Sequence, residues 1–539
     1  MKNKSGKIIY ISISLAILSL LAYFFYWRNI RGSGFYASDE GYYVQIIKTY
    51  FYAIKYFKNL IFGHENLGSL KDYLAVYGGP FYNNAREGYI FLLSGVSSLF
   101  LKDYNFYHGL EWSALFGIAN IYLVYIFVLS NFGRGYALIA AVLFAISPLS
   151  VAFARSGMTI TTAMFFLLSG ILLYFKSFLK PKFIRYAAFC FGLAFSCHYN
   201  LLWIFPVVLL VELYYFINKN KKIKRIINFL IFLSLPLILI ESLTILIMFF
   251  LKGQPYFIQR KTAGYVDYFS GLLLMFKGIS DNSFTEVIEN NPFYYMVLLI
   301  KQHSIYFVFL CLLGWTSIVK MFIKTKDEKW LFLSAFFIPF ILYSLIYHKA
   351  DRMILPFIPI ICIYVAIIPF FLNNKAKFLI AIPLILIFMH ETRMSVKALK
   401  YQMDISEAIS YMKNGQGLKH ISSRMYISQA YIGKQNVIDD FYTLGRTPGE
   451  SGKSEISLAS LRDAYEDGFR YYLNYYGDEH RLAKIARQIN PEKTYYKYHN
   501  TEGHYGRLPN ALSDVQVEAI KIYDLKKIID HYKELNLSG

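Results

Sequence analysis

Long apolar segments, separated by short polar connections, constrain this sequence more than any other feature. A transmembrane α-helix needs about 20 apolar residues to cross a hydrocarbon core about 30 Å thick. Eleven segments approach this length: residues 8–27, 110–131, 135–153, 159–179, 184–198, 201–218, 226–251, 303–323, 330–347, 353–372 and 377–392. Since 56% of the residues are hydrophobic and 17% are charged, a soluble fold could not bury this surface. The sequence therefore predicts a polytopic α-helical membrane protein with about 11 transmembrane helices.

Charge in the short connections sets the predicted orientation. The basic residues 1–7 precede an apolar run without a small-residue cleavage site, which indicates an uncleaved anchor with a cytoplasmic N-terminus. The run Gly88–Leu101 is short for a crossing, and whether it crosses decides the side of every later loop. If it does not cross, all the lysine- and arginine-rich connections are cytoplasmic: 131–134, 176–185, 218–225, 320–329 and 373–377. Because cytoplasmic loops are enriched in these residues, we favour this topology.

Two domains are predicted. Residues 1–394 form the membrane domain, whose first outer loop spans residues 28–110. Within that loop, residues 42–62 mix aromatic residues, isoleucines and lysines, which suits a helix lying in the membrane interface. Residues 395–539 carry 20 basic and 18 acidic residues and form a soluble extracytoplasmic tail. The formal charge of +21 therefore lies almost wholly in the membrane half, which argues against nucleic-acid binding.

The tail mixes short strand and helix patterns, so a small α/β domain is expected. Strands are predicted at 424–427, 436–438 and 470–473, and helices at 406–412, 482–489 and 521–533. The sequence leaves open whether this domain binds an acceptor or covers the membrane domain.

Two adjacent carboxylates, Asp39 and Glu40, follow the first apolar segment at the predicted outer surface. Ionised groups near hydrocarbon are costly, and they are kept for chemistry or for pairing. A carboxylate partly removed from water gains proton affinity, so it could act as a general base toward a hydroxyl nucleophile. The same residues would suit the start of the interfacial helix, with Ser38 or Asp39 as N-cap. The spacing alone leaves both roles open.

Basic side chains on the same predicted face could bind an anion. Arg86 stands where the outer loop returns to the short apolar run, and Arg155 stands at the outer end of a later span. Each could be a phosphate ligand or an interfacial anchor. A further outer loop holds His348, Lys349 and Arg352 within five residues. A loop this cationic opposes the usual charge bias and favours an anionic partner such as a lipid phosphate.

Glu87, His198 and His348 could together hold a divalent cation, because carboxylates and imidazoles are common metal ligands. No two of them have the local spacing of a metal motif, so the question of a metal stays open at this stage. The sequence also has no P-loop, no dinucleotide-binding glycine motif and no serine-hydrolase elbow. We therefore assign no cofactor beyond this possible divalent metal.

The order of these elements resembles the type C glycosyltransferases, closest to the branch of the protein O-mannosyltransferases and the lipid A aminoarabinose transferases. The resemblance covers roughly residues 1–395. It rests on the anchor followed by Asp39-Glu40-Gly41-Tyr42-Tyr43, and on the runs Arg134-Gly135-Tyr136 to Ser147-Pro148-Leu149, Ala154-Arg155-Ser156-Gly157 and His348 to Pro359. It implies a sugar donor on a polyprenyl phosphate and an inverting single displacement at the outer or lumenal face.

By that resemblance, Asp39 is the base that deprotonates the acceptor hydroxyl, and Glu40 supports it or contacts substrate. Arg86 and Arg352 would contact the donor phosphate. The proline pair that usually follows the first of these arginines is absent, and so is a second external acid that is frequent in the family. The tail lacks the repeated β-trefoil insertion of eukaryotic protein mannosyltransferases, which favours a prokaryotic relative.

The functional hypothesis is an integral-membrane glycosyltransferase of a prokaryotic plasma membrane. It would move a hexosyl or pentosyl group from a polyprenyl-phosphate donor to a hydroxyl of a lipid, glycan or protein at the outer face. Two alternatives stay open: a ligase or polymerase of lipid-linked oligosaccharides, and a transporter or flippase of an anionic polyprenyl-linked lipid. A transporter would carry ionisable groups near the midplane of several spans, where Glu212 and Glu241 are the candidates.

Overall fold

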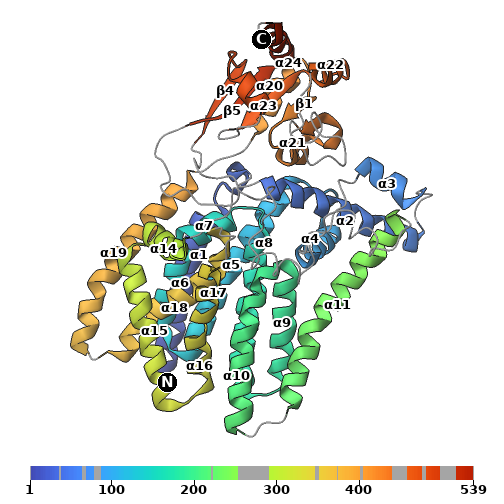
Figure 1. The fold of residues 1–539 in the computed structure, drawn as a ribbon. Coiled ribbons are helices and arrows are strands. Elements are labelled where there is room, and N and C mark those ends of the chain that lie inside the picture. The colour runs from blue at the N-terminus through green and yellow to red at the C-terminus, as the bar shows by residue number, and fades with distance from the viewer. Residues whose placement is uncertain are drawn as a thin grey trace.

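The structure is a computed structural model, and it describes residues 2–34, 38–63, 68–77, 87–219, 223–252, 291–345, 351–372, 374–400, 405–439, 458–475, 481–497 and 517–537. Long helices run side by side as a bundle, and a small α/β domain stands on one end of it (Figure 1). The N-terminus lies at the opposite end of the bundle.

Nine helical segments of the described chain are long and apolar enough to cross a membrane, and a bent pair of helices can be counted as a tenth. Each falls on a predicted apolar segment, so the protein is an integral membrane protein. The long helices are α1 (Lys2–Ala22), α5 (Phe106–Asn131), α8 (Thr159–Leu179), α10 (Ile204–Lys219), α11 (Lys224–Lys252), α15 (Ile305–Thr325), α16 (Glu328–Ala335) with α17 (Phe337–Leu345), α18 (Ile358–Phe371) and α19 (Asn374–Leu399).

The predicted span 135–153 is bent. It consists of α6 (Arg134–Ala145) and α7 (Pro148–Ala154), which meet at 60°. Pro148 lacks the backbone N–H that would continue α6. The Ser147 hydroxyl accepts a hydrogen bond from a backbone N–H in the first turn of α7, so a new helix starts there.

The predicted span 184–198 is α9 (Phe183–Cys197), an apolar helix of fifteen residues that is too short to count among the nine. It packs against both α8 and α11. The contact with α11 is close, because a Cβ added at Gly192 would lie 2.3 Å from Leu233 O. A glycine at this position lets the two backbones approach each other.

Three helices of the first outer loop lie at the end of the bundle that carries the α/β domain. α2 (Ser38–Phe62) runs across the long helices rather than along them (Figure 1), as predicted for an interfacial helix. α3 (Leu70–Tyr77) and α4 (Glu87–Phe100) pack against it. The fourteen residues of α4 coincide with the short apolar run of the sequence.

The C-terminal domain contains a five-stranded sheet in the order β2-β1-β3-β5-β4. β1 is parallel to β2 and β3, whereas β5 is antiparallel to β3 and β4. One face packs on α20 and α21 and joins the core of the bundle, and the other face packs on α22, α23 and α24. The elements are α20 (Ser406–Asn414), β1 (His420–Ser422), α21 (Met425–Ile432), β2 (Val437–Asp439), α22 (Leu458–Glu466), β3 (Tyr471–Tyr475), α23 (Arg481–Ala486), β4 (Lys493–Lys497), β5 (Val517–Asp524) and α24 (Leu525–Leu537). The predicted small α/β domain is confirmed.

Two local predictions in this domain are wrong. Residues 424–427, predicted as a strand, lie at the start of α21, and the short strand β1 comes just before them. The predicted helix 521–533 begins only at Leu525, because the preceding residues belong to β5. β1 and β5 both pair with β3, so a long-range partner rather than the local pattern decides these strands.

The connections of the bundle lie at its two ends in the predicted relative arrangement. The end of α10 and the start of α11, the end of α15 and the start of α16, and the end of α18 and the start of α19 lie at the same end of the bundle as the N-terminus (Figure 1). The α/β domain and α2 lie at the other end. Which end faces the cytoplasm stays a prediction from the loop charges.

Candidate active site

Asp39 and Glu40 fall in the first turn of α2, because this helix begins at Ser38. Their side chains lie outside the described part of the structure. The backbone N–H groups of a first helical turn carry a partial positive charge, which favours carboxylates there. This placement fits both roles considered for the pair, a helix-capping role and a catalytic one.

Tyrosine contacts connect the start of α2 to two other segments. Tyr43 lies one turn after Asp39, hence on the same side of the helix. Its ring packs edge-on against Tyr89 of α4, with ring centroids 6.2 Å apart. The hydroxyl of Tyr89 donates a hydrogen bond to Gly157 O at 2.9 Å. The first turns of α2 and α4 therefore meet the turn that follows α7.

The start of α4 is pressed against the end of α9. Glu87, the first residue of α4, is buried, and a Cβ added at Gly88 would lie 2.0 Å from Ser196 Oγ. His198 ends α9, is also buried, and stacks its ring on Tyr199. Among the described residues, no group of three or more His, Cys, Asp or Glu side chains is placed to hold a metal ion.

Arg155 ends α7 and points its guanidinium at the segment that follows the first span. Nη1 donates to Arg28 O at 2.9 Å, and Nη2 donates to Asn29 O at 3.2 Å and to Ser33 Oγ at 2.7 Å. The residue is 7% exposed. Burial lowers the pKa of Arg155 to about 10, so the side chain stays charged at neutral pH.

Arg352 lies in a 3-10 turn, Asp351–Met353, that contacts α7. Arg352 and Asp351 are both buried. The carboxylate of Asp351 accepts a hydrogen bond from the Tyr294 hydroxyl at 2.6 Å, which connects this turn to α14 (Tyr294–His303). Arg86, His348 and Lys349 lie outside the described residues.

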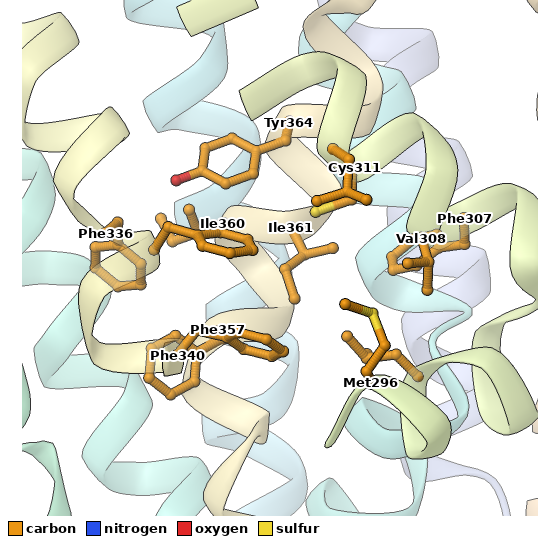
Figure 2. A pocket seen from close by; sticks show the side chains of 13 residues that line it. Met296, Phe307, Val308, Cys311, Phe336, Phe340, Phe357, Ile360, Ile361 and Tyr364 are labelled. Carbon is orange, nitrogen blue, oxygen red and sulfur yellow. The ribbon is translucent and has the colours of Figure 1, made fainter. Parts of the chain in front are cut away.

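A small apolar hollow of about 20 Å³ includes Phe357, five residues after Arg352, in its wall. Figure 2 shows that side chains from α14 and α15, from α16 and α17, and from the start of α18 converge on it. Its lining residues are Met296, Leu299, Phe307, Val308, Cys311, Leu312, Phe336, Phe337, Phe340, Phe357, Ile360, Ile361 and Tyr364. This hollow is apolar, but its volume is only about that needed to hold one water molecule.

The C-terminal domain contacts the same region through α21, which packs on α2. Gln45 and Gln429, both buried, are joined by a hydrogen bond of 3.1 Å from Gln45 Nε2 to Gln429 Oε1. The ring of Tyr431 lies against Phe106, with centroids 3.8 Å apart. No local sequence pattern indicates these contacts, because the partners are far apart in the chain.

Two buried ionisable pairs were not predicted from the sequence. Glu212 of α10 binds Arg225, the second residue of α11, at 2.7 Å. His303 Nδ1 lies 2.8 Å from Glu391 Oε1, which joins α14 to α19. Single ionisable residues inside apolar segments were the available signal, since such residues seldom lack a partner.

Comparisons with known proteins identify the fold. No protein-family model matches the chain. A stretch of 123 residues is 32% identical to the "Putative mannosyltransferase YkcB" of Bacillus subtilis (strain 168), and it spans 22% of this chain and only 17% of that relative.

Two solved structures share the architecture over most of the chain. The oligosaccharyltransferase of Archaeoglobus fulgidus in the apo form has a TM-score of 0.57 at 13% identity, covering 89% of this chain and 70% of that one. ArnT from Cupriavidus metallidurans in the apo state has a TM-score of 0.56 at 10% identity, covering 97% of this chain and 98% of that one. The first has also been solved with an inhibitory peptide and a dolichol-phosphate, and ArnT with undecaprenyl phosphate. This chain therefore has the type C glycosyltransferase fold, as its sequence suggested.

Proposed function

We propose that this protein is an inverting glycosyltransferase that uses a polyprenyl-phosphate sugar as donor. The observation that carries the proposal is a convergence at one end of the bundle. The acidic first turn of α2, the turn after α7 and the Arg352 turn gather there beside an apolar hollow. Sugar transfer from such a donor needs three parts: a base for the acceptor hydroxyl, a site for the donor phosphate and an apolar surface for the donor's hydrocarbon tail.

Asp39 is the proposed base. It takes the proton of the acceptor hydroxyl as the acceptor oxygen attacks the anomeric carbon, while the bond from that carbon to the donor phosphate breaks. The leaving group is a phosphate that is already a stable anion, so a strong general acid is not required. Glu40 supports the base or contacts substrate.

Arg352 is the proposed ligand of the donor phosphate, together with Arg86, His348 and Lys349. A guanidinium matches the geometry of phosphate oxygens. The first isoprene units of the donor would pack against apolar side chains such as Phe357 and Ile360, which follow Arg352 along the chain. That dolichol-phosphate and undecaprenyl phosphate occupy the two structural neighbours supports this donor class.

The acceptor is a hydroxyl of a lipid, glycan or protein at the outer face of a prokaryotic plasma membrane. The basic connections at the N-terminal end of the bundle support a cytoplasmic N-terminus, with the α/β domain outside. Because α21 rests on α2, this domain stands beside the route by which an acceptor would reach Asp39. The likeness to an oligosaccharyltransferase supports a lipid-linked oligosaccharide as a second candidate donor.

The transporter alternative is less well supported. A carrier needs ionisable groups that can change partners near the membrane midplane. The Glu212 carboxylate instead receives hydrogen bonds from Arg225 at 2.7 and 2.9 Å and from Tyr174 at 2.7 Å. These three contacts hold it in a fixed structural arrangement.

The direct test is sugar transfer by the purified protein in proteoliposomes, with a labelled polyprenyl-phosphate sugar and a panel of lipid and peptide acceptors. Replacing Asp39→Asn should lower kcat by at least about 100-fold, the usual contribution of a general base. Asp72→Asn is the matched control, because Asp72 is an exposed carboxylate of α3 in the same outer loop. Full activity of the Asp39 variant would refute the proposed base, and movement of labelled lipid without a new glycosidic product would favour the transporter.

A further inference from the structure

Arg155 fixes the segment that leads into α2. Its three hydrogen bonds go to Arg28 O, Asn29 O and Ser33 Oγ, all between the end of the first span and the start of α2. The first helical span ends at Trp27, so Arg28 O lies outside its hydrogen-bond ladder, whereas Asn29 O also accepts a hydrogen bond from Gly32 N at 3.2 Å. A buried cation that binds both carbonyls complements the negative end of the helix dipole.

The segment that Arg155 holds is compact. Asn29 has a left-handed backbone (φ 52°), and a short 3-10 turn, Ile30–Ser33, follows it. Gly34 also has a positive φ of 63°, which a glycine adopts without strain. α2 begins at Ser38, five positions after Ser33 in the sequence, so a fixed Ser33 limits how far away this first turn can lie.

A second contact runs from the same turn to α2. Two residues beyond Arg155, Gly157 O accepts the hydrogen bond from Tyr89, and the Tyr89 ring supports Tyr43. Residues 155–157 therefore contact the approach to α2 directly, and through Tyr89 of α4 they support Tyr43 in its second turn. Asp39 stands between these two points of support.

We propose that Arg155 is a positioning residue, which sets the place of the Asp39 carboxylate instead of gripping the donor phosphate. The inference rests on the proposed function, since it requires Asp39 to be the base. Three donors of the guanidinium are already used by the protein, and the side chain is 7% exposed. Two of the five donors remain, so a phosphate that used the whole planar fork would displace bonds that hold the approach to α2.

The two roles differ in steady-state kinetics. Loss of a positioning residue should lower kcat by about 10- to 100-fold, because a base displaced by about 1 Å loses most of its effect. The KM for the polyprenyl-phosphate donor should stay within about threefold, because no ground-state contact with donor is removed. A phosphate ligand would instead raise the donor KM.

The experiment measures kcat and donor KM for Arg155→Met and Arg155→Lys in proteoliposomes. Lysine binds phosphate as a point charge but lacks the planar fork that reaches two carbonyls and a hydroxyl. Positioning therefore predicts that lysine restores little of kcat. Arg31→Met is the matched control, because the side chain of Arg31 is 65% exposed in the same segment, and its kinetics should be those of the wild type.

Two further variants keep the test informative if Arg155→Met misfolds. Ser33→Ala removes one of the three hydrogen bonds and should lower kcat a few-fold without changing donor KM. Adding Arg155→Met to Asp39→Asn should cause no further loss, because the two changes act on one group. A donor KM raised tenfold with kcat unchanged, or a wild-type kcat in both Arg155→Met and Ser33→Ala, would overturn the inference. A fully active Asp39→Asn would instead overturn the proposed function itself.

Discussion

The buried pair of Glu212 and Arg225 allows a sharp stability prediction. We expect Arg225→Met to be strongly destabilising, whereas the double change Glu212→Leu with Arg225→Met should be far milder. The Glu212 side chain is 2% exposed and that of Arg225 is 10% exposed. Removing the arginine therefore leaves a carboxylate in an apolar environment, which costs more than the pair contributes when intact.

The size of the effect follows from the contacts. Arg225 gives two charge-assisted hydrogen bonds to the carboxylate, at 2.7 and 2.9 Å, and one of 2.8 Å to Ser177 Oγ. Hydrogen bonds to a charged group contribute about 1.5–3 kcal/mol each. The single variant should therefore lose about 3–5 kcal/mol of unfolding free energy, which is the usual cost of breaking a buried ion pair. Tyr174 alone, at 2.7 Å, cannot compensate the stranded charge.

The assay is equilibrium unfolding in mixed detergent micelles, followed by loss of helical circular dichroism, for both single variants and the double variant. The double variant should recover at least about 2 kcal/mol relative to the sum of the single changes, because no charge is left without a partner. Strict additivity, or an Arg225→Met protein within about 1 kcal/mol of wild type, would refute the reasoning.

Three other predictions concern separate contacts. Burial lowers the pKa of His420 to about 4, so as pH falls the unfolded chain binds a proton before the folded chain does. Between pH 6.5 and 4 the free energy that protects β1 from hydrogen exchange should therefore drop by about 1.4 kcal/mol per pH unit. The His420→Leu variant should not show this pH dependence. Gly314→Ala would place a Cβ 2.2 Å from a carbonyl oxygen of α18 and should cost about 1–3 kcal/mol in thermal unfolding, whereas Gly95→Ala, with no atom within 4 Å, should not destabilise. Gln45→Ala and Gln429→Ala should each make the α/β domain more susceptible to proteolysis. In a double-mutant cycle, the interaction energy between the two changes should be about 0.5–1.5 kcal/mol.

Each of these predictions has an outcome that contradicts it. A pH slope that persists in the His420→Leu variant would place the titrating group elsewhere. Equal melting temperatures for the Gly314 and Gly95 variants would mean that α15 can move away from α18 at little cost. Effects of Gln45→Ala and Gln429→Ala that simply add would show that the two amides stabilise the domain independently.

The sequence predicted the architecture well, because membrane spans need long apolar runs and short basic loops, and both are local features. The transverse helix α2 was predicted from its mixed composition for the same reason. The bend before α7 also has a local signal, since Pro148 lies inside the apolar run 135–153. The prediction of one continuous span over these residues did not take it into account.

What the sequence could not show is pairing across the chain. The hydrogen bond between Gln45 and Gln429 joins residues 384 positions apart, and His303 and Glu391 are 88 positions apart. The role of Arg155 has the same character, since its acceptors lie more than a hundred residues earlier. The type of a residue and its position in an apolar segment indicate that it is a candidate, but only the fold shows which residue it contacts.

The contact of α21 with α2 has a consequence for biosynthesis. A ribosome adds about 5–20 residues per second, so Gln429 leaves it roughly 20–80 s after Gln45, given the 384 positions between them. During that interval α2 lacks the packing that α21 provides. A chain truncated before α21 should therefore insert into the membrane but have an unsupported α2, and a truncation series assayed for transfer would reveal the length at which activity first appears.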